Sequence, residues 1–390
     1  MIPYGRQDVD DDDVKAVVRA LQAEYLTQGP TVREFEDAIA SICGTTKAVA
    51  ANSATSALHL ACLALGVGTG DEVWTTPITF VASANCAIYC GASVEYIDIE
   101  RGSFNMDPGR LADRLRDAGR TGKLPKVVIP VHLAGTPADM SAIVAICHEY
   151  EVRILQDASH ALGATIDGRS ALSSEFGDIA VTSFHPVKMI TTAEGGAAVT
   201  SDADLANRMV RLRSHGVTRA PHEMVHAPDG PWYYEQIELG FNYRMPDLFA
   251  ALGLSQLRRL EHFVNRRNEI AEEYRRLLDP ADFTLQVVPE GTRSSRHLVI
   301  AIPNYEHLRT SQRELFERLR SRGIMANLHY IPVYRHPFHR ARLIGEPDCP
   351  NAEWYYARAI TLPCFPGMTT QDVETVALAL GEPVGHQTIF

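Results

Sequence analysis

The chain has 390 residues, which is too long for one ordinary hydrophobic core, so two domains are expected. Hydrophobic residues make up 45% and charged residues 22%, as in a soluble globular enzyme, and the net charge of −11 argues against a nucleic-acid-binding surface. The first residues lack the basic start and apolar core of a signal peptide, and no apolar run is long enough to cross a bilayer. A cytoplasmic protein that does not contact the membrane is therefore expected.

The cysteines and histidines do not indicate a metal site. The seven cysteines are scattered, form no CxxC pair and fall mostly within apolar helical patterns, which favours reduced thiols in the core. His329, His336 and His339 lie near one another in the sequence, but no cysteine or carboxylate cluster joins them. We expect no metal.

The first half of the chain alternates short β-branched runs with helical patterns. Strands are expected at residues 73–77, 93–99, 126–133, 152–157 and 178–184. Helices are expected at residues 14–22, 53–65 and 79–90, and again after residues 107 and 137. This alternation predicts an α/β fold in which a mostly parallel sheet lies between helices. Ligands of such sheets bind at the carboxyl ends of the strands.

The second half begins with a long amphipathic pattern that predicts one helix over residues 252–278. Beyond it, strand-like runs at residues 296–302 and 324–334 alternate with helical patterns at residues 308–322 and 371–380. This pattern predicts a smaller C-terminal α+β domain. We take the long helix as the connector and place the boundary near Leu260. The large domain would comprise residues 1–260 and the small domain residues 261–390.

Lys188 is the most informative residue, because its segment SFHPVKMITTAEGG carries no other charge before Glu194. Partial desolvation there would lower the pKa of the lysine and free its amine to act as a nucleophile or base. A lysine of this kind is a candidate Schiff-base residue for pyridoxal phosphate. A buried lysine stem that reaches solvent would give the same pattern, so the decision depends on the other contacts of the cofactor.

Five further positions have a natural role around such a cofactor. Asp157 ends a predicted strand, where a carboxylate can keep a pyridine nitrogen protonated, although a turn cap would look the same. His160 could bond the phenolic oxygen or be a structural histidine. Ser53 opens a predicted helix whose free N–H groups suit a phosphate, and Ser183 could reach the same phosphate, although a plain helix cap and a buried serine would look the same. Phe80 could stack on the ring, although core packing would also account for it.

Several runs, taken in chain order, carry a resemblance that covers essentially the whole chain: LTQGPTVREFE, NSATSAL, TTPITFVASAN, QDASHALGA, SFHPVKMITTAEGG, RSHG and GFNYRMPDLFAALGLSQL. They resemble the DegT/DnrJ/EryC1/StrS family of nucleotide-sugar aminotransferases, which are pyridoxal-phosphate enzymes of fold type I. Within this family the chain is most similar to transaminases of pseudaminic acid biosynthesis. The resemblance therefore implies a homodimeric enzyme of this fold, with pyridoxamine phosphate as the second form of its cofactor.

The resemblance also implies roles for individual residues. Lys188 and Asp157 would be catalytic, with Lys188 forming the Schiff base and moving the proton. The cofactor would be bound by Ser53, Ala54, Thr55, Phe80, Asp157, His160, Ser183, Lys188 and, from the neighbouring subunit, Asn242. The sugar-nucleotide pocket would be lined by Tyr4, Glu24, Tyr25, Leu26, Thr27, Asn327, Leu328, His329 and Tyr330.

The implied reaction transfers an amine from L-glutamate to C4 of a UDP-linked 4-keto-6-deoxy-N-acetylhexosamine. The chain departs from the family pattern at Met189, where proline is expected, and at Glu24 and Tyr25. Both departures concern the substrate side, so amination of a GDP-linked 4-keto sugar or of a dTDP-linked 3- or 4-keto sugar stays open. A pyridoxamine-dependent sugar dehydratase would carry histidine in place of Lys188. A non-catalytic regulator would not need Asp157, Ser183, Lys188 and Asn242 together.

Overall fold

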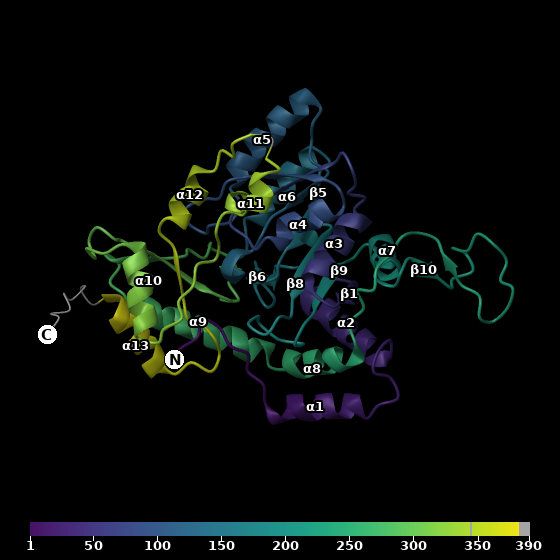
Figure 1. Cartoon of the computed structure of the whole chain (residues 1–390), viewed down its shortest axis with the longest axis horizontal. Helices are drawn as coiled ribbons and strands as arrows, with labels where there is room; N and C mark the ends of the chain where they lie inside the picture. The colour runs from purple at the N-terminus through teal and green to yellow at the C-terminus, as the bar shows by residue number, and fades with distance from the viewer. Residues whose placement is uncertain (344, 382–390) are drawn as a thin grey trace.

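A central sheet of seven strands organises the protein (Figure 1), whose computed structural model describes residues 1–343 and 345–381. The strand order is β1-β9-β8-β5-β4-β2-β3. Parallel pairing joins β3, β2, β4, β5 and β8, whereas β9 and β1 are antiparallel to their neighbours. The strands are β1 Lys47–Ala51, β2 Glu72–Thr75, β3 Ser93–Tyr96, β4 Val127–Ile129, β5 Arg153–Asp157, β8 Ile179–Ser183 and β9 Gly196–Thr200. The predicted mostly parallel α/β fold is confirmed, while β1 and β9 were not predicted.

Helices cover both faces of the sheet, and each face has its own core. One core joins the sheet to α3, α4 and α7, and the other joins it to α2, α5, α6 and α8. Local signals fix several helix starts, as at α5, where the side chain of Asp107 caps the helix and Pro108 occupies its first turn. The helices are α2 Pro30–Cys43, α3 Ala54–Ala64, α4 Ala82–Tyr89, α5 Pro108–Thr121, α6 Met140–Glu149, α7 Ala203–Arg213 and α8 Asp247–Leu257.

The C-terminal part is the expected α+β unit, with a small antiparallel sheet in the order β12-β14-β15. Helices α9, α10 and α13 pack with this sheet around a third core. A fourth core joins both parts of the chain, since Ile78 and Leu133 share it with Ile300 and Tyr355. The division at Leu260 stays a prediction. The elements are α9 Leu260–Leu277, β12 Phe283–Leu285, β14 Val299–Pro303, α10 Gln312–Ser321, α11 Pro337–Arg340, α12 Pro350–Tyr356, β15 Ile360–Leu362 and α13 Thr370–Gly381.

The predicted single helix over residues 252–278 is wrong in one respect, because the structure divides it into α8 and α9. At the break, the backbone N–H of Arg259 bonds the carbonyl of Gln256. The side chain of Arg259 forms ion pairs with Asp8, Asp10 and Asp13, at the start of helix α1 (Asp11–Leu21). The amphipathic pattern predicts helix but carries no information about this distant partner.

The predicted strand over residues 324–334 is also wrong. This segment makes only isolated bridges, from Ile324 to Ile2 and from Asn327 to Thr361, before a short 3-10 turn at Val333–Arg335. A proline at position 332 has no N–H to donate to a ladder. The segment consequently leaves the sheet and, as shown below, enters the functional site.

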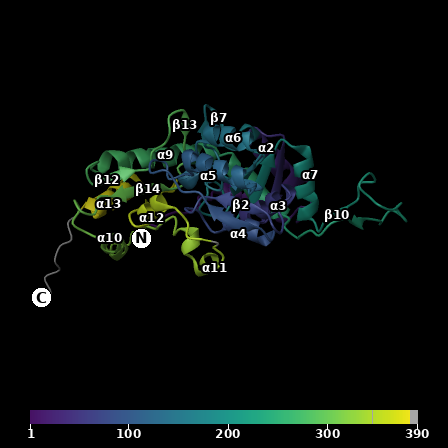
Figure 2. The same cartoon turned by 90° about the horizontal axis from the view of Figure 1, so that it is seen from above.

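Short secondary sheets complete the chain. Strands β6 Thr165–Ile166, β7 Arg169–Ser170 and β13 Thr292–Arg293 form one of them. Strands β10 Val217–Thr218 and β11 Glu235–Gln236 form the base of an arm, residues 217–240, that projects from the body (Figures 1 and 2). Within the described part of the chain, no helix is both long and apolar enough to span a bilayer.

Candidate active site

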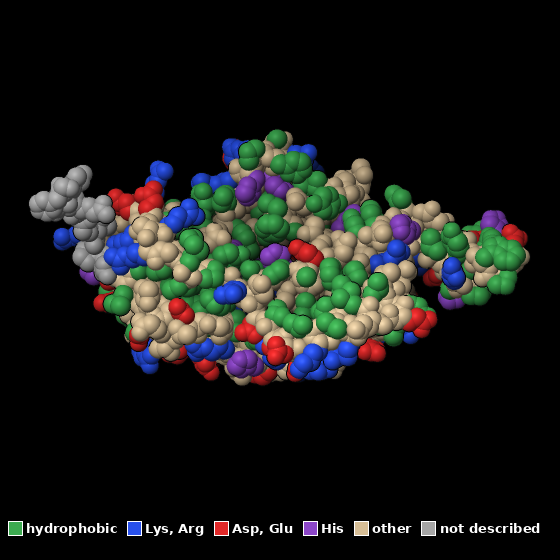
Figure 3. Space-filling model, turned by 60° about the horizontal axis from the view of Figure 1, so that its bottom comes forward, with side chains coloured by type: hydrophobic (Ala, Val, Ile, Leu, Met, Phe, Trp, Pro, Cys, Tyr) green, Lys and Arg blue, Asp and Glu red, His purple; other side chains and the backbone are tan. Residues whose placement is uncertain are grey.

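A cavity of about 710 Å³ lies where strands β5 and β8 end, on the side of the sheet that the strand directions predict. The face in Figure 3 is hollowed near its centre, where hydrophobic and histidine side chains gather. Predicted site residues that line the cavity are Tyr4, Ser53, Ala54, Thr55, Phe80, Asp157, His160, Ser183, Lys188, Asn327, Leu328, His329 and Tyr330. Segments far apart in the sequence thus meet in one place.

Lys188 lies in the loop after β8, where its backbone N–H bonds the carbonyl of His185 at 2.8 Å. Its side chain is partly buried and lines the cavity. Burial is the main cause that lowers the pKa of the Lys188 amine to about 8; the negative charge of Asp157 opposes this shift, and the positive charge of Arg267 adds to it. A neutral, nucleophilic amine is therefore accessible near neutral pH.

Asp157 ends β5 and is 5% exposed, with its carboxylate on the cavity wall. Its Oδ2 accepts a hydrogen bond of 2.6 Å from the hydroxyl of Ser83, and Oδ1 accepts one of 3.1 Å from the backbone N–H of Ser159. Among the residues that the structure describes, no lysine or arginine forms an ion pair with this carboxylate. A buried carboxylate held in this way can face a protonated ring nitrogen.

Ser83 was not predicted. It is fully buried in α4, and its hydroxyl is also 2.7 Å from that of Thr79. The only signal was its place in the run TTPITFVASAN, whose sequence does not reveal that α4 packs beside the end of β5.

A cradle for an anion lies beside the lysine loop. The sheet register places Ser183 opposite Gly196, and Gly196 opposite Ala51, just before the start of α3. A Cβ atom at Gly196 would come 2.4 Å from the backbone nitrogen of Ala54, so glycine lets β9 approach this helix start. The helix start and the Ser183 hydroxyl fit a phosphate group. The Ser53 hydroxyl itself accepts the N–H of Ser56 as a helix cap.

The opposite wall of the cavity is aromatic. Phe80 is 58% exposed, and its ring centroid lies 6.1 Å from that of Tyr330. Such a ring is available to stack on a planar ligand. His160 bonds the backbone N–H of Ala134 through Nδ1 and the hydroxyl of Tyr330 through Nε2, so both of its nitrogens have protein partners.

The predicted substrate residues fall into two groups. Tyr4 packs against His329, whose Nδ1 lies 3.0 Å from the Thr361 hydroxyl, and burial lowers the pKa of His329 to about 3. Asn327, Leu328 and Tyr330 complete this wall. The second group is outside the cavity of a single chain and exposed: Glu24, Tyr25, Leu26, Thr27 and the cofactor residue Asn242. The roles predicted for these residues stay predictions.

Arg267 is a second residue that the sequence did not single out. It is 1% exposed, and its guanidinium donates to the carbonyls of Cys364 at 2.6 Å and His297 at 3.1 Å. A buried positive charge close to the lysine loop favours the neutral form of the amine. The helical pattern of residues 252–278 gave no sign of this role.

A neutral amine, a buried carboxylate, a phosphate cradle and an exposed aromatic ring around one cavity define a pyridoxal-phosphate enzyme of the α/β class. The chain belongs to the DegT/DnrJ/EryC1/StrS aminotransferase family, whose sequence pattern matches residues 7–381. It is therefore an aminotransferase that depends on pyridoxal phosphate.

Individual relatives agree with this assignment. The chain is 37% identical to the UDP-4-amino-4,6-dideoxy-N-acetyl-beta-L-altrosamine transaminase of Campylobacter jejuni, over 96% of each chain. The structure of Helicobacter pylori PseC, an aminotransferase involved in the biosynthesis of pseudoaminic acid, superimposes with a TM-score of 0.88 at 31% identity, over 97% of this chain and 98% of that one. The structure of the sugar aminotransferase Spr1654 of Streptococcus pneumoniae in its PLP form superimposes with a TM-score of 0.87 at 28% identity, over 97% of both chains.

Proposed function

We propose that this enzyme transfers the amino group of L-glutamate to C4 of a UDP-linked 4-keto-6-deoxy-N-acetylhexosamine, in the synthesis of pseudaminic acid or a related surface sugar. The observation that carries the proposal is the placement of Lys188 and Asp157 on one cavity with a phosphate cradle. The printed activity of the Campylobacter jejuni relative supports the choice of sugar.

The residues around the cavity account for the steps of such a transfer. Bound pyridoxal phosphate supplies an electron sink that stabilises negative charge on the carbon next to the amine. Lys188 would hold the cofactor covalently. Once released from the cofactor, its amine would carry the proton to and from that carbon, which its lowered pKa permits near neutral pH. Asp157, held by Ser83, would keep the ring nitrogen protonated, and Ser183 with the start of α3 would anchor the phosphate. Two substrates would use the same site in turn, so the kinetics are expected to be ping-pong.

The test is incubation of the cofactor-loaded protein with L-glutamate and a panel of UDP-, dTDP- and GDP-linked keto sugars, followed by mass spectrometry of the products. Amination of the UDP-linked 4-keto sugar is expected, and Lys188→Ala should abolish both product and visible absorbance. Amination of only a GDP- or dTDP-linked sugar would overturn the choice of substrate but not the class of enzyme. A wild-type protein that stays colourless with added cofactor would contradict the whole proposal.

We further propose that the active enzyme is a homodimer in which Asn242 of one subunit completes the site of the other. Asn242 and the segment 24–27 are exposed and lie outside the cavity of their own chain. The arm of residues 217–240 exposes Val225, Trp232 and Leu239 by 72–78%, an apolar surface typical of an interface.

Mixing of two inactive variants tests this proposal. In a mixed dimer of Lys188→Ala with Asn242→Asp, both lesions fall in the same shared site, which leaves the other site intact. Co-expression should therefore restore roughly a quarter of the wild-type activity, since half of the dimers are mixed and each has one working site. No recovery, although mixed dimers are shown by mass spectrometry, would contradict a shared site.

A further inference from the structure

The hydroxyl of Tyr330 and the ring of His160 form a pair whose proton positions can be assigned. The backbone N–H of Ala134 donates to Nδ1 of His160 at 3.2 Å, so Nδ1 carries no proton. In the neutral ring the proton is then on Nε2, which lies 3.1 Å from the Tyr330 oxygen. His160 therefore donates to Tyr330, and the tyrosine oxygen is the acceptor.

This assignment leaves the proton of the Tyr330 hydroxyl without a hydrogen-bond acceptor among the described residues. Within residues 1–343 and 345–381, the only hydrogen-bond partner of this hydroxyl is His160. Tyr330 lines the same cavity as Lys188, Asp157 and Phe80. Because the Tyr330 hydroxyl accepts its hydrogen bond from His160, it can donate its own proton to an acceptor in the cavity.

The surroundings keep the His160 ring neutral and the Tyr330 phenol protonated. Burial lowers the pKa of His160 well below its usual value, helped by the positive charge of Lys188, so the ring stays neutral. Burial and the negative charge of Asp157 raise the pKa of Tyr330, so the phenol keeps its proton. His160 is 5% exposed and its ring also packs 4.5 Å from that of His297, which restricts its rotation.

We propose that Tyr330 donates a hydrogen bond to a negatively charged or strongly polarised oxygen of the bound reactants, and that His160 is the positioning residue that orients it. The acceptor is either the phenolic oxygen of the cofactor or the oxygen of the substrate carbonyl. This rests on the proposed function. It also changes the expectation for His160, which acts through Tyr330 because both of its nitrogens are already bonded.

The experiment compares Tyr330→Phe, His160→Leu, His160→Gln and the double variant Tyr330→Phe/His160→Leu, all loaded with cofactor. Visible spectra are recorded without substrate, and each half-reaction is then followed by stopped flow, with L-glutamate and with the keto sugar. Loss of one donor to a charged oxygen should slow the affected step by roughly tenfold to a hundredfold in Tyr330→Phe. Glutamine can accept from Ala134 and donate to Tyr330, so His160→Gln should recover most of what His160→Leu loses.

The double variant tests the relation between the two residues. If His160 acts through Tyr330, His160→Leu should change the rates by no more than about twofold once Tyr330 is already phenylalanine. A shifted absorption band in Tyr330→Phe identifies the cofactor oxygen as the acceptor. An unchanged band with a slower sugar half-reaction, lower kcat and unchanged KM identifies the substrate oxygen.

Two results would overturn the inference. One is a Tyr330→Phe protein with wild-type spectrum and rates. The other is an undiminished effect of His160→Leu in the phenylalanine background, which would give His160 a role of its own. Wild-type protein run in parallel separates these outcomes from a failure of the proposed function, because that failure would remove the glutamate or the keto-sugar half-reaction from the wild type as well. Equal thermal unfolding of all variants shows that their folds are intact.

Discussion

The hydroxyl of Ser83 on α4 donates a hydrogen bond of 2.6 Å to Oδ2 of Asp157 at the end of β5. This bond joins two elements that are distant in sequence and holds the carboxylate toward the cavity. Removal of a hydrogen bond to a charged group generally costs about 1.5–3 kcal/mol. The orientation of Asp157 is therefore expected to depend on a residue that touches no reactant.

Ser83→Ala should slow the glutamate half-reaction by on the order of tenfold and weaken cofactor retention. Both are measured by stopped flow and by equilibrium dialysis of the cofactor. Thr79→Val is the matched control, because it removes the neighbouring hydroxyl but leaves the bond from Ser83 to Asp157. Equal losses in the two variants would mean that general packing, and not the carboxylate, is responsible.

Gly196→Ala should damage the phosphate cradle. The added Cβ would lie 2.4 Å from the nitrogen of Ala54, and backbone cannot move aside as a flexible side chain can. We expect at least a tenfold rise in the dissociation constant of the cofactor and a loss of about 1–3 kcal/mol in the free energy of unfolding. Gly68→Ala is the control, because its Cβ would meet nothing within 4 Å. Tight cofactor binding by Gly196→Ala would contradict the close approach of β9 to α3.

The charge of Lys188 should make the cofactor-free protein sensitive to pH. Its pKa is lowered from 10.5 to about 8, so the folded state binds the proton less tightly than the unfolded chain. The charged amine thus destabilises the fold below pH 8, and this cost disappears as the pH rises from about 8 toward 10.5.

Cofactor-free Lys188→Met should accordingly be more stable than wild type at pH 7, by on the order of 1 kcal/mol after allowance for the partial exposure of the side chain. The advantage should shrink at pH 10. Urea unfolding at both pH values measures it, and a difference that is the same at the two values would contradict the lowered pKa.

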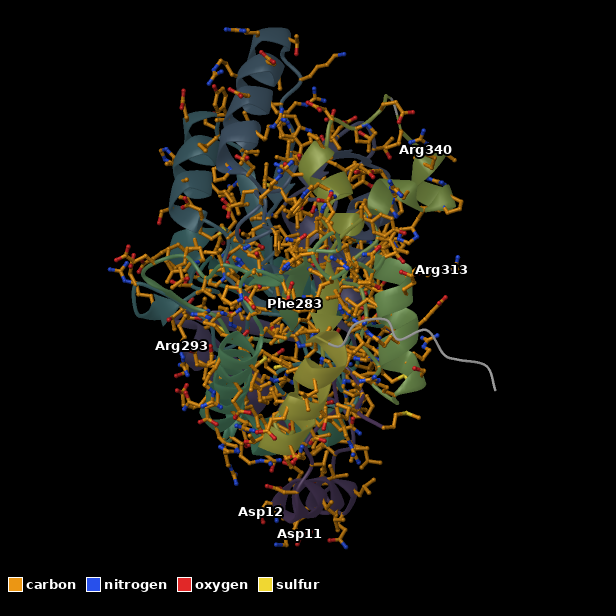
Figure 4. All side chains as sticks on the ribbon, turned by 90° about the vertical axis from the view of Figure 1, so that its left-hand side faces the viewer. Asp11, Asp12, Phe283, Arg293, Arg313 and Arg340 are labelled. Atoms are coloured by element: carbon orange, nitrogen blue, oxygen red, sulfur yellow. The ribbon has the colours of Figure 1, made fainter. Side chains whose placement is uncertain are left out.

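Arg259 should hold α1 against the junction of α8 and α9. Its guanidinium lies 2.6 Å from the carboxylate of Asp13, which is fully buried, and also pairs with Asp8 and Asp10. Figure 4 shows Asp11 and Asp12 on the outer side of the same helix, and their side chains are exposed.

Arg259→Met leaves the buried charge of Asp13 without its cation and should lower the free energy of unfolding by roughly 2–4 kcal/mol. Arg116→Met, which breaks an exposed pair with Asp113, should cost less than about 1 kcal/mol. Equal costs in urea unfolding would show that the Asp13 pair contributes no more than a surface pair.

Local sequence signals were sufficient for much of the fold. The alternation of strands and helices follows from periodicities of single segments, and the capped start of α5 follows from Asp107 and Pro108. The break at Arg259 could not be predicted in this way, because it depends on Asp13, which is far away in the sequence. The strand expected over residues 324–334 was wrong for a local reason, since Pro332 has no N–H for a ladder, but the bridges of this segment to Ile2 and Thr361 required the tertiary structure.

For the site, the sequence by itself determined which chemistry is available: a lysine in an apolar loop, a carboxylate at a strand end and a glycine pair. Only the tertiary structure decided which groups act on these residues. Ser83 and Arg267 enter the site because α4 and α9 pack beside the strand ends, and Tyr330 and His160 pair because an irregular segment crosses the cavity. Hydrogen bonds and desolvation act over a few ångströms in space, whereas a sequence pattern records only the order of residues along the chain.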